Sequence, residues 1–242
     1  MDRIADAKSL LKIDVVIPVC NESQVIDLVI EQWLNQIKSL HPDSRIIVED
    51  AKSSDGTVDL LRKWNMHKNV SVHFRSDRDG FSKALLRLFK VSQNDWVFVA
   101  DSDGQYVVTD FEHFINRAIE GAQFIKGVKV NRRDGFLRRA FSFVFNRYIS
   151  IILNVPPYDY NSSHYLISRN LLDHVLLTGP KFRSQVNVEV ALRALLSNAK
   201  FQVVYVKHNK RVHGISRENA PRKFLSNGFI TMRDVWILKT NF

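Results

Sequence analysis

The decisive stretch of the chain reads Trp96-Val97-Phe98-Val99-Ala100-Asp101-Ser102-Asp103-Gly104-Gln105, an apolar run that passes directly into two aspartates. A short apolar run bounded by turn residues predicts a buried strand of a parallel sheet, and ligands bind beyond the carboxyl ends of such strands. Two carboxylates in Asp-x-Asp spacing suit one Mg²⁺ or Mn²⁺ ion, with the side-chain carbonyl of Gln105 as a further oxygen donor. The alternative for an isolated Asp-x-Asp is a solvated turn, so the rest of the chain has to decide.

The composition predicts one domain with an anionic partner. The chain has 242 residues, 45% of them hydrophobic, which suffices for one well-packed α/β domain. Its formal net charge of +10 favours nucleotide phosphates, nucleic acid or an acidic membrane surface as partners. A single cysteine, Cys20, excludes an internal disulfide. The charged start and the lack of a long apolar run predict neither a secretory signal nor a membrane span, so we expect a cytoplasmic protein, soluble or peripheral to a membrane.

Apolar runs recur along the first half of the chain, with helical patterns between them. They predict strands at 13–19, 45–48, 70–74, 95–100 and 124–130. Helices are predicted at 25–37, from Thr57 onward, at 81–91 and after a cap at Thr109. Strands joined by helices of this length indicate right-handed crossovers. We therefore expect a single Rossmann-like α/β domain with a mainly parallel central sheet flanked by helices.

The second half of the chain has a different character. A helix predicted from Phe136 to Ile152 carries an aromatic, apolar face flanked by arginines, and Pro156-Pro157 ends it. The remaining predicted elements are strands at 165–168 and 201–206, a helix at 186–197 and an amphipathic segment at 224–238.

Further motifs stand at the other predicted strand ends. Ile17 to Glu22 matches Ile-Pro-x-Tyr-Asn-Glu, Val48 to Thr57 matches Val-Asp-Asp-Gly-Ser-x-Asp-Gly-Thr, and Arg211 to Arg217 matches Arg-x-x-Gly-x-Ser-Lys. With Asp-x-Asp-Gly-Gln, and with Lys129 at the end of a Gly-x-Arg motif, they occur in one fixed order. In this the chain resembles the inverting glycosyltransferases of family 2, and within them the polyprenyl-phosphate sugar transferases typified by dolichol-phosphate mannose synthase. The resemblance implies the GT-A fold.

The resemblance also implies a metal-dependent, inverting transfer of a sugar from a nucleoside-diphosphate sugar of the UDP or GDP type. Mg²⁺ or Mn²⁺ and basic side chains would neutralise the leaving diphosphate. The implied catalytic residues are Asp101, Asp103, Glu189 and Arg211, and the implied metal ligands are Asp101, Asp103 and Gln105. The implied nucleotide-sugar-binding residues are Pro18, Cys20, Glu22, Val48, Asp50, Asp101, Ser102, Asp103, Lys129, Arg211 and Arg217. The implied acceptor-binding residues are Arg138, Ser142 and Asn146.

The chain departs from the family pattern at several of these positions. Cys20 replaces a tyrosine, and the segment from Glu49 to Thr57 is one residue longer than the common form and lacks its glycine. Lys129 replaces an arginine and Arg217 replaces a lysine, which keeps the charge and changes the geometry of a phosphate contact.

Three side chains near these motifs each keep two interpretations. His208 and His213 either complete a metal shell, as histidines of this region do in some GT-A enzymes, or lie on the surface. Glu189 either acts as a general base or supports other residues of the site. A lipid phosphate is already anionic and needs no base, whereas a sugar hydroxyl requires one.

The aromatic, basic helix at 141–152 and the tail around Trp236 favour a polyprenyl phosphate acceptor at the cytoplasmic face of a membrane, with a membrane protein as a further candidate partner. Transfer to a sugar hydroxyl of a glycan, a nucleotidyltransferase activity and a non-catalytic nucleotide-sugar-binding module stay open as alternatives. Nucleic acid is not an expected partner, because no RNA or DNA module is recognised. We expect a nucleotide-binding half at 1–130, an acceptor-side half at 131–222 and an amphipathic C-terminal helix at 223–242.

Overall fold

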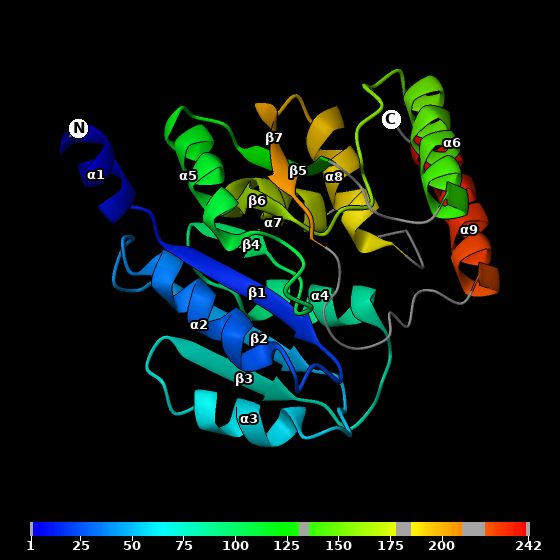
Figure 1. The fold of residues 1–242 in the computed structure, drawn as a ribbon. Helices are drawn as coiled ribbons and strands as arrows, with labels where there is room; N and C mark the ends of the chain where they lie inside the picture. The colour runs from blue at the N-terminus through cyan, green and yellow to red at the C-terminus, as the bar shows by residue number, and fades with distance from the viewer. Residues whose placement is uncertain (1, 131–135, 178–184, 210–220, 241–242) are drawn as a thin grey trace.

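The computed structural model describes residues 2–130, 136–177, 185–209 and 221–240. The strands among these residues form one sheet in the order β3-β2-β1-β4-β6-β5-β7, with helices packed on both faces (Figure 1). The strands are β1 (Ile13–Val19), β2 (Arg45–Asp50), β3 (Val70–Phe74), β4 (Trp96–Val99), β5 (Phe124–Val130), β6 (Tyr165–Ser168) and β7 (Phe201–Lys207). The helices are α1 (Asp2–Ser9), α2 (Ile26–Ile37), α3 (Thr57–Trp64), α4 (Phe81–Val91), η1 (Val108–Asp110), α5 (Phe111–Ile119), α6 (Phe136–Leu153), α7 (Arg169–Leu177), α8 (Val186–Leu196) and α9 (Pro221–Lys239).

The sheet is parallel except for β6, which runs antiparallel to both β4 and β5. This confirms the expected α/β domain with a mainly parallel sheet. From β1 the strand order runs outward to β2 and β3 on one side and continues with β4 on the other. The order therefore reverses between β1 and β4, and ligands of open α/β sheets bind at such a switch point. The Asp-x-Asp segment begins just beyond the end of β4.

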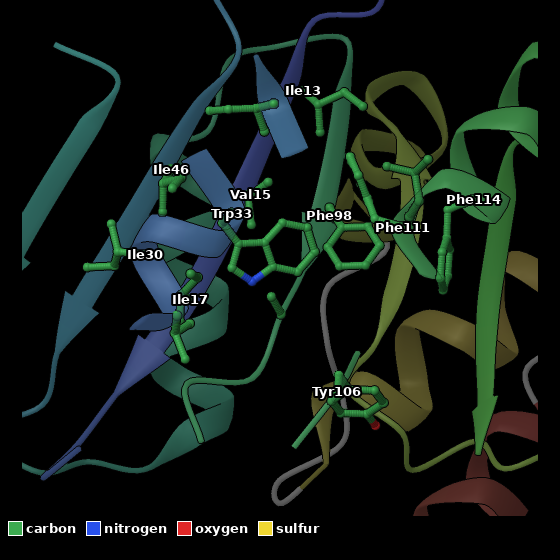
Figure 2. Close-up of a cluster of buried hydrophobic side chains, with 14 of the residues drawn as sticks. Ile13, Val15, Ile17, Ile30, Trp33, Ile46, Phe98, Tyr106, Phe111 and Phe114 are labelled. Atoms are coloured by element: carbon green, nitrogen blue, oxygen red, sulfur yellow. The ribbon is translucent and has the colours of Figure 1, made fainter. Parts of the chain in front are cut away.

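Trp33 of α2 anchors the core on one face of the sheet. Its ring centroid lies 4.9 Å from that of Phe98 on β4 and 5.2 Å from that of Phe111 on α5 (Figure 2). These contacts hold α2 and α5 against the strand that leads into the Asp-x-Asp segment. The alternate residues of β4 point to the opposite face and pack into a second buried cluster with α4, α7 and α8.

The structure corrects the predicted start of α5. Thr109 does not cap a helix, because it lies inside the short 3₁₀ helix η1, and α5 begins after Asp110. Asp110 makes no capping bond; its carboxylate accepts a hydrogen bond of 2.8 Å from the backbone N–H of Lys207. This carboxylate ties the start of α5 to the end of β7.

Other element bounds differ in smaller ways. The helices α1 and α7 have no counterpart in the sequence prediction, and α9 begins at Pro221 instead of 224. Glu49 and Asp50 were expected after the second strand and are instead the last residues of β2. The division of the domain at residues 130 and 222 stays a prediction. No helix in the described part of the chain combines the length and the apolar character needed to cross a membrane.

Candidate active site

The ends of β1 and β2 bring the first two predicted motifs together. The backbone N–H of Asn21 donates to the Ser53 hydroxyl at 2.7 Å, and the backbone N–H of Glu22 donates to the Thr57 hydroxyl at 2.9 Å. Asn21 holds a left-handed backbone conformation with φ 58°, which turns the chain toward this contact. The two segments predicted to hold a nucleoside therefore form one wall of the site.

The remaining predicted residues of this wall differ in exposure. Val48 is fully buried in the core and Pro18 is half-buried on β1. The thiol of Cys20 donates to the carbonyl of Ala51 at 3.5 Å, so it stands beside the same loop. Because Val48 is enclosed by apolar side chains, any contribution it makes to binding comes through shape and backbone.

The longer form of the 49–57 segment is accommodated by an unusual backbone turn. Lys52 has φ 55°, in the left-handed region that few non-glycine residues adopt. The guanidinium of Arg78 donates to the carbonyl of Lys52 from both Nε, at 2.9 Å, and Nη2, at 2.7 Å. Arg78, which the sequence analysis did not single out, thus holds the turn that the extra residue requires.

Asp50 is almost completely buried at the end of β2, with 1% of its surface exposed. Its Oδ2 accepts a hydrogen bond from the backbone N–H of Ser53 at 3.0 Å. Its Oδ1 is also buried and has no hydrogen-bond partner among the described residues. A buried acceptor left without a donor costs about 1–3 kcal/mol, so this oxygen is a candidate acceptor for a ligand donor, and the nucleoside-binding role of Asp50 stays a prediction.

A buried ion network, missed by the sequence analysis, lies next to Asp50. Arg87 of α4 donates to Glu49 with Nε 2.9 Å from Oε2, and its Nη1 lies 2.7 Å from Oδ2 of Asp79. Hydrogen bonds to Asp79 and then Glu49 raise the pKa of Arg87, and the bond from Arg87 lowers the pKa of Asp79. The network fixes the end of β2 and hence the backbone that carries Asp50.

The Asp-x-Asp segment leaves β4 as a turn whose side chains are held in place. Oδ1 of Asp103 accepts a hydrogen bond of 3.1 Å from the backbone N–H of Gln105, and the Ser163 hydroxyl donates to Oδ1 of Asp101. Nε2 of Gln105 donates to the carbonyl of Asn209 at 2.9 Å, which holds this side chain against the residues that follow β7. The metal-ligand role of Gln105 stays a prediction.

Aromatic rings gather directly behind this segment. The ring of Tyr106 is contacted edge-on by His208, with centroids 5.0 Å apart, and Nζ of Lys129 lies 5.3 Å from the Tyr106 centroid. Burial, and then the charge of Asp101, raises the pKa of Tyr106, so its hydroxyl is neutral. The structure thus places Lys129 and His208 against Tyr106, three residues after Asp103, and their roles in a phosphate clamp or a metal shell stay predictions. His213, Arg211 and Arg217 lie outside the described residues.

Lys126 of β5 is a second feature that the sequence analysis missed. Its side chain is fully buried, and its Nζ donates to the carbonyls of Tyr160, at 3.2 Å, and Ser162. Burial lowers the pKa of Lys126 to about 7, although the charges of Asp159 and Asp101 oppose the shift. The available signal was weak, because Lys126 is one of two lysines, with Lys129, in the predicted strand 124–130.

The acceptor-side residues lie where α6 packs against α9, side by side in Figure 1. Ser142 and Asn146 line a small cavity whose other walls are Phe141, Phe145, Asp159, Asn161, Gln185 and Gly228. Oδ1 of Asn146 accepts a hydrogen bond of 3.4 Å from the backbone N–H of Tyr160. Two of the three predicted acceptor residues therefore share one cavity; the side chain of Arg138 lies outside the described part of the structure.

Glu189 lies on α8 and forms an ion pair with Arg193, one helical turn further on. The carboxylate Oε1 is 2.7 Å from Nε of Arg193, and both side chains are almost fully buried. Oε1 of this carboxylate is therefore engaged by the guanidinium inside the fold. The role of Glu189 as a general base stays a prediction.

The donor set at the end of β4 fits a hard divalent cation. Among the described residues, no three side chains of His, Cys, Asp or Glu gather into a metal cage. Two carboxylates at one strand end are what Mg²⁺ or Mn²⁺ use when substrate phosphates and water complete the shell. Asp101 and Asp103 would hold the ion, which would supply charge neutralisation on a bound diphosphate.

Comparison with known protein families shows to which family the chain belongs. The family model described as glycosyl transferase family 2 matches residues 14–176, which is more than half of the chain. The chain belongs to glycosyl transferase family 2. The family resemblance read from the motifs is thereby confirmed, and the protein is a family 2 glycosyltransferase.

Relatives and solved structures add detail around this family 2 glycosyltransferase. It is 26% identical over 167 residues to the undecaprenyl-phosphate 4-deoxy-4-formamido-L-arabinose transferase of Proteus mirabilis (strain HI4320), a match of 68% of this chain and 51% of the relative. The chain thus spans about half the length of this curated relative. Glucosyl-3-phosphoglycerate synthase from Mycobacterium tuberculosis, in complex with Mn²⁺, uridine-diphosphate and phosphoglyceric acid, superposes with a TM-score of 0.70 at 21% identity, covering 98% of this chain and 81% of that one. The structure of the same enzyme with Mg²⁺ and uridine-diphosphate superposes with a TM-score of 0.66 at 20% identity, covering 96% of this chain and 82% of that one. These neighbours confirm the GT-A fold.

Proposed function

We propose that this glycosyltransferase moves a sugar from a uridine-diphosphate sugar to a polyprenyl phosphate, with Mg²⁺ or Mn²⁺ at Asp101 and Asp103. The observation that carries the proposal is the unpartnered buried Oδ1 of Asp50, which lies on the same sheet edge as the two aspartates. A nucleoside diphosphate matches this arrangement, because it carries a hydrogen-bond donor on its base at one end and the diphosphate at the other.

The single open oxygen of Asp50 favours uracil over guanine. Uracil presents one ring N–H, whereas guanine presents a ring N–H and an exocyclic amino group side by side, which suit a carboxylate with two available oxygens. One oxygen of Asp50 is already committed to the backbone N–H of Ser53. The solved neighbours that bind uridine-diphosphate support the same base.

The reaction follows from charge and position. As the sugar leaves the diphosphate, negative charge grows on the leaving group, and Lys129, whose Nζ lies against the ring of Tyr106 just after the aspartate segment, would stabilise that charge. Arg211 and Arg217 would add to this clamp. The acceptor attacks the anomeric carbon from the opposite face, so the configuration inverts.

The ion pair of Glu189 with Arg193 favours an acceptor that needs no general base. A phosphate oxygen is anionic at neutral pH and attacks directly, whereas a sugar hydroxyl must lose a proton. Because Oε1 of Glu189 is engaged by Nε of Arg193 and both side chains are almost fully buried, this carboxylate is poorly placed to reach an acceptor hydroxyl. The curated relative named as an undecaprenyl-phosphate transferase supports the same choice of acceptor.

The surface formed by α6 and α9 supports peripheral attachment to an anionic membrane, which we place at the cytoplasmic face. Its exposed apolar side chains are Phe143, Val144, Ile151, Phe229, Trp236 and Ile237. Arg147, Arg233 and Lys239 are exposed on the same two helices. Aromatic side chains flanked by basic ones are typical of segments that lie in the membrane interface. A membrane protein partner is compatible with this placement.

The proposal is tested by measuring which acceptor is required for the release of uridine-diphosphate. We expect release from a UDP-sugar panel only when undecaprenyl phosphate is presented in mixed micelles with Mg²⁺ or Mn²⁺, and no release after Asp101→Asn or Asp103→Asn. Phosphoglycerate and a water-soluble glycan serve as alternative acceptors. Release with the glycan and not with the lipid phosphate, together with loss of activity in Glu189→Gln, would overturn the lipid acceptor and assign Glu189 as the base.

A further inference from the structure

Lys126 stands on β5 at a position where the sheet is otherwise filled by apolar side chains. It is 0% exposed, and its Nζ lies 4.9 Å from the ring centroid of Tyr165 on the neighbouring strand β6. A charged or polar group buried this deeply destabilises a fold unless its hydrogen bonds are made. An apolar side chain of similar length would fill the same space without that cost, so the amino group needs a purpose beyond packing.

The purpose is visible in what the amino group binds. It donates to the backbone carbonyls of Tyr160 and Ser162, in the segment 159–164 that leads into β6. Both an ammonium and a neutral amine carry enough hydrogens for two such bonds, so the contact does not depend on the protonation state. Lys126 thus fastens the loop from inside the sheet.

A second contact fastens the same loop to β5. The backbone N–H of Gly127 donates to the carbonyl of His164 at 2.8 Å. A Cβ atom at Gly127 would lie 2.8 Å from that carbonyl oxygen, which is closer than real Cβ contacts come. Glycine at this position therefore permits the approach, and residues 126 and 127 together fix both ends of the stretch from Tyr160 to His164.

Between these two anchors lies Ser163, and its hydroxyl donates to Oδ1 of Asp101. Asp101 is 62 residues away in the sequence and sits at the switch point of the sheet. The loop also contacts the acceptor side of the site, because the backbone N–H of Tyr160 donates to Oδ1 of Asn146. One short segment therefore contacts both the metal side and the acceptor side of the site.

We propose that Lys126 is a positioning residue for the metal-binding carboxylate: by holding the carbonyls of Tyr160 and Ser162, it keeps the Ser163 hydroxyl on Asp101 and so orients Asp101 toward the cation. The inference rests on the proposed function, because it takes Asp101 as a metal ligand. Groups that orient metal ligands typically contribute 10- to 100-fold to metal affinity, which gives the size of the expected effect.

The experiment measures Mn²⁺ affinity in the presence of uridine-diphosphate, by calorimetry and by the electron paramagnetic resonance signal of free Mn²⁺. Lys126→Met keeps the length of the side chain and removes both donors, and Ser163→Ala removes only the hydroxyl. We expect each to weaken Mn²⁺ binding at least tenfold, and the double variant to be no weaker than Lys126→Met alone. Hydrogen exchange of the amides at 162–164 should accelerate in Lys126→Met and not in Ser163→Ala.

The matched control is Tyr165→Phe. Tyr165 adjoins Lys126 and is equally buried, and its hydroxyl donates a hydrogen bond of 3.1 Å to Oδ1 of Asn187 on α8 instead of to the loop. It should lower stability and leave Mn²⁺ affinity within twofold of the wild type. If Lys126→Met does not fold, Ser163→Ala against Ser163→Thr decides, because threonine keeps the hydroxyl and should keep the affinity.

The possible failures are separable. Wild-type protein that binds no Mn²⁺ with uridine-diphosphate would overturn the proposed function and this inference with it. A wild type that binds, with unchanged affinity in Lys126→Met or in Ser163→Ala, would overturn the positioning role alone. Additive losses in the double variant would show that the two residues act separately and would also overturn it.

Discussion

The ring of Tyr106 lies flat on the ring of His164, with centroids 4.0 Å apart and 4° between the ring planes. Through this stack Tyr106, which directly follows the Asp-x-Asp segment, contacts the loop that enters β6. Burial lowers the pKa of His164 well below its usual value, and neither ring nitrogen has a hydrogen-bond partner among the described residues. His164 therefore acts in this place as a neutral, flat packing surface.

The first prediction distinguishes the contribution of the ring stack to stability from that of the Tyr106 hydroxyl, which lies 3.0 Å from the Ser162 hydroxyl. Tyr106→Phe keeps the ring and loses one hydrogen bond, so we expect a loss of about 1 kcal/mol in unfolding free energy and most of the activity retained. Tyr106→Ala removes the ring, and the loss should reach about 3–5 kcal/mol. Urea unfolding and uridine-diphosphate release measure the two effects. Equal stability of the two variants would show that the stack contributes nothing.

The second prediction concerns the base contact of Asp50. Asp50→Asn should weaken uridine-diphosphate binding about tenfold or more, because the buried acceptor for a base N–H is lost or replaced by an amide donor. Asp43→Asn, an exposed aspartate paired with Lys12, is the matched control and should leave binding unchanged. Calorimetry with uridine- and guanosine-diphosphate measures both. Tighter binding of guanosine-diphosphate by the wild type would contradict the assignment of the base.

The third prediction concerns the pH dependence of stability. The pKa of Lys126 falls to about 7 in the folded protein, whereas an unfolded lysine titrates near 10.4. Between these values the unfolded chain binds more protons, so the contribution of Lys126 to stability rises with pH, by at most about 1.4 kcal/mol per pH unit. Below pH 7 both states are protonated and the contribution is constant.

Urea unfolding of the wild type and Lys126→Met at pH 6, 7.5 and 9 tests this sign. The wild type should gain stability relative to the variant as the pH rises from 7.5 to 9, and the difference should be flat below pH 7. A difference that shrinks with rising pH would mean that the folded protein holds the ammonium more strongly than water does.

The fourth prediction concerns the α6–α9 surface. Trp236 is 53% exposed and Phe229 is 66% exposed, with basic side chains on the same helices. Vesicles with anionic lipid should bind the protein, and binding should weaken as salt is added, because each basic residue contributes about 1 kcal/mol only near the charged surface. Trp236→Ala should reduce binding in co-sedimentation. Met66, which is 88% exposed on the far side of the sheet beyond α3, gives the control Met66→Ala, and an equal loss there would rule out a localised surface.

Local patterns in the sequence predicted the parts of the fold that depend on neighbours in the chain. The apolar runs at 13–19, 70–74 and 124–130 are strands with the predicted bounds, since short runs of buried apolar side chains leave a direct mark on the sequence. Thr109 shows the limit of that approach. Its residue type favours a cap, but Asp110 is drawn to the backbone of Lys207, and this distant contact sets where α5 starts.

The candidate site was predictable where motifs carry it and hidden where long-range contacts build it. Asp50 is the last residue of β2 and the Asp-x-Asp segment follows β4, and sequence motifs single out both as candidates. Arg87 reaches Glu49 across 38 residues, and Lys126 reaches Ser162 across 36. Separations of this size leave no periodic signal, and a lysine in a mainly apolar strand does not indicate which residue it contacts.

The reversed direction of β6 has a consequence for how this molecule can vary. Because β6 runs against β4 and β5, its beginning lies at the edge where its neighbours finish, with Tyr165 opposite Val99. The segment 154–164, which follows α6 and leads into β6, therefore reaches the edge of the sheet where β4 ends. We expect the segment before β6 to be the place where specificity can be engineered. A change in the length or composition of residues 154–164 would change the acceptor preference and leave the proposed uridine pocket at the ends of β1 and β2 intact.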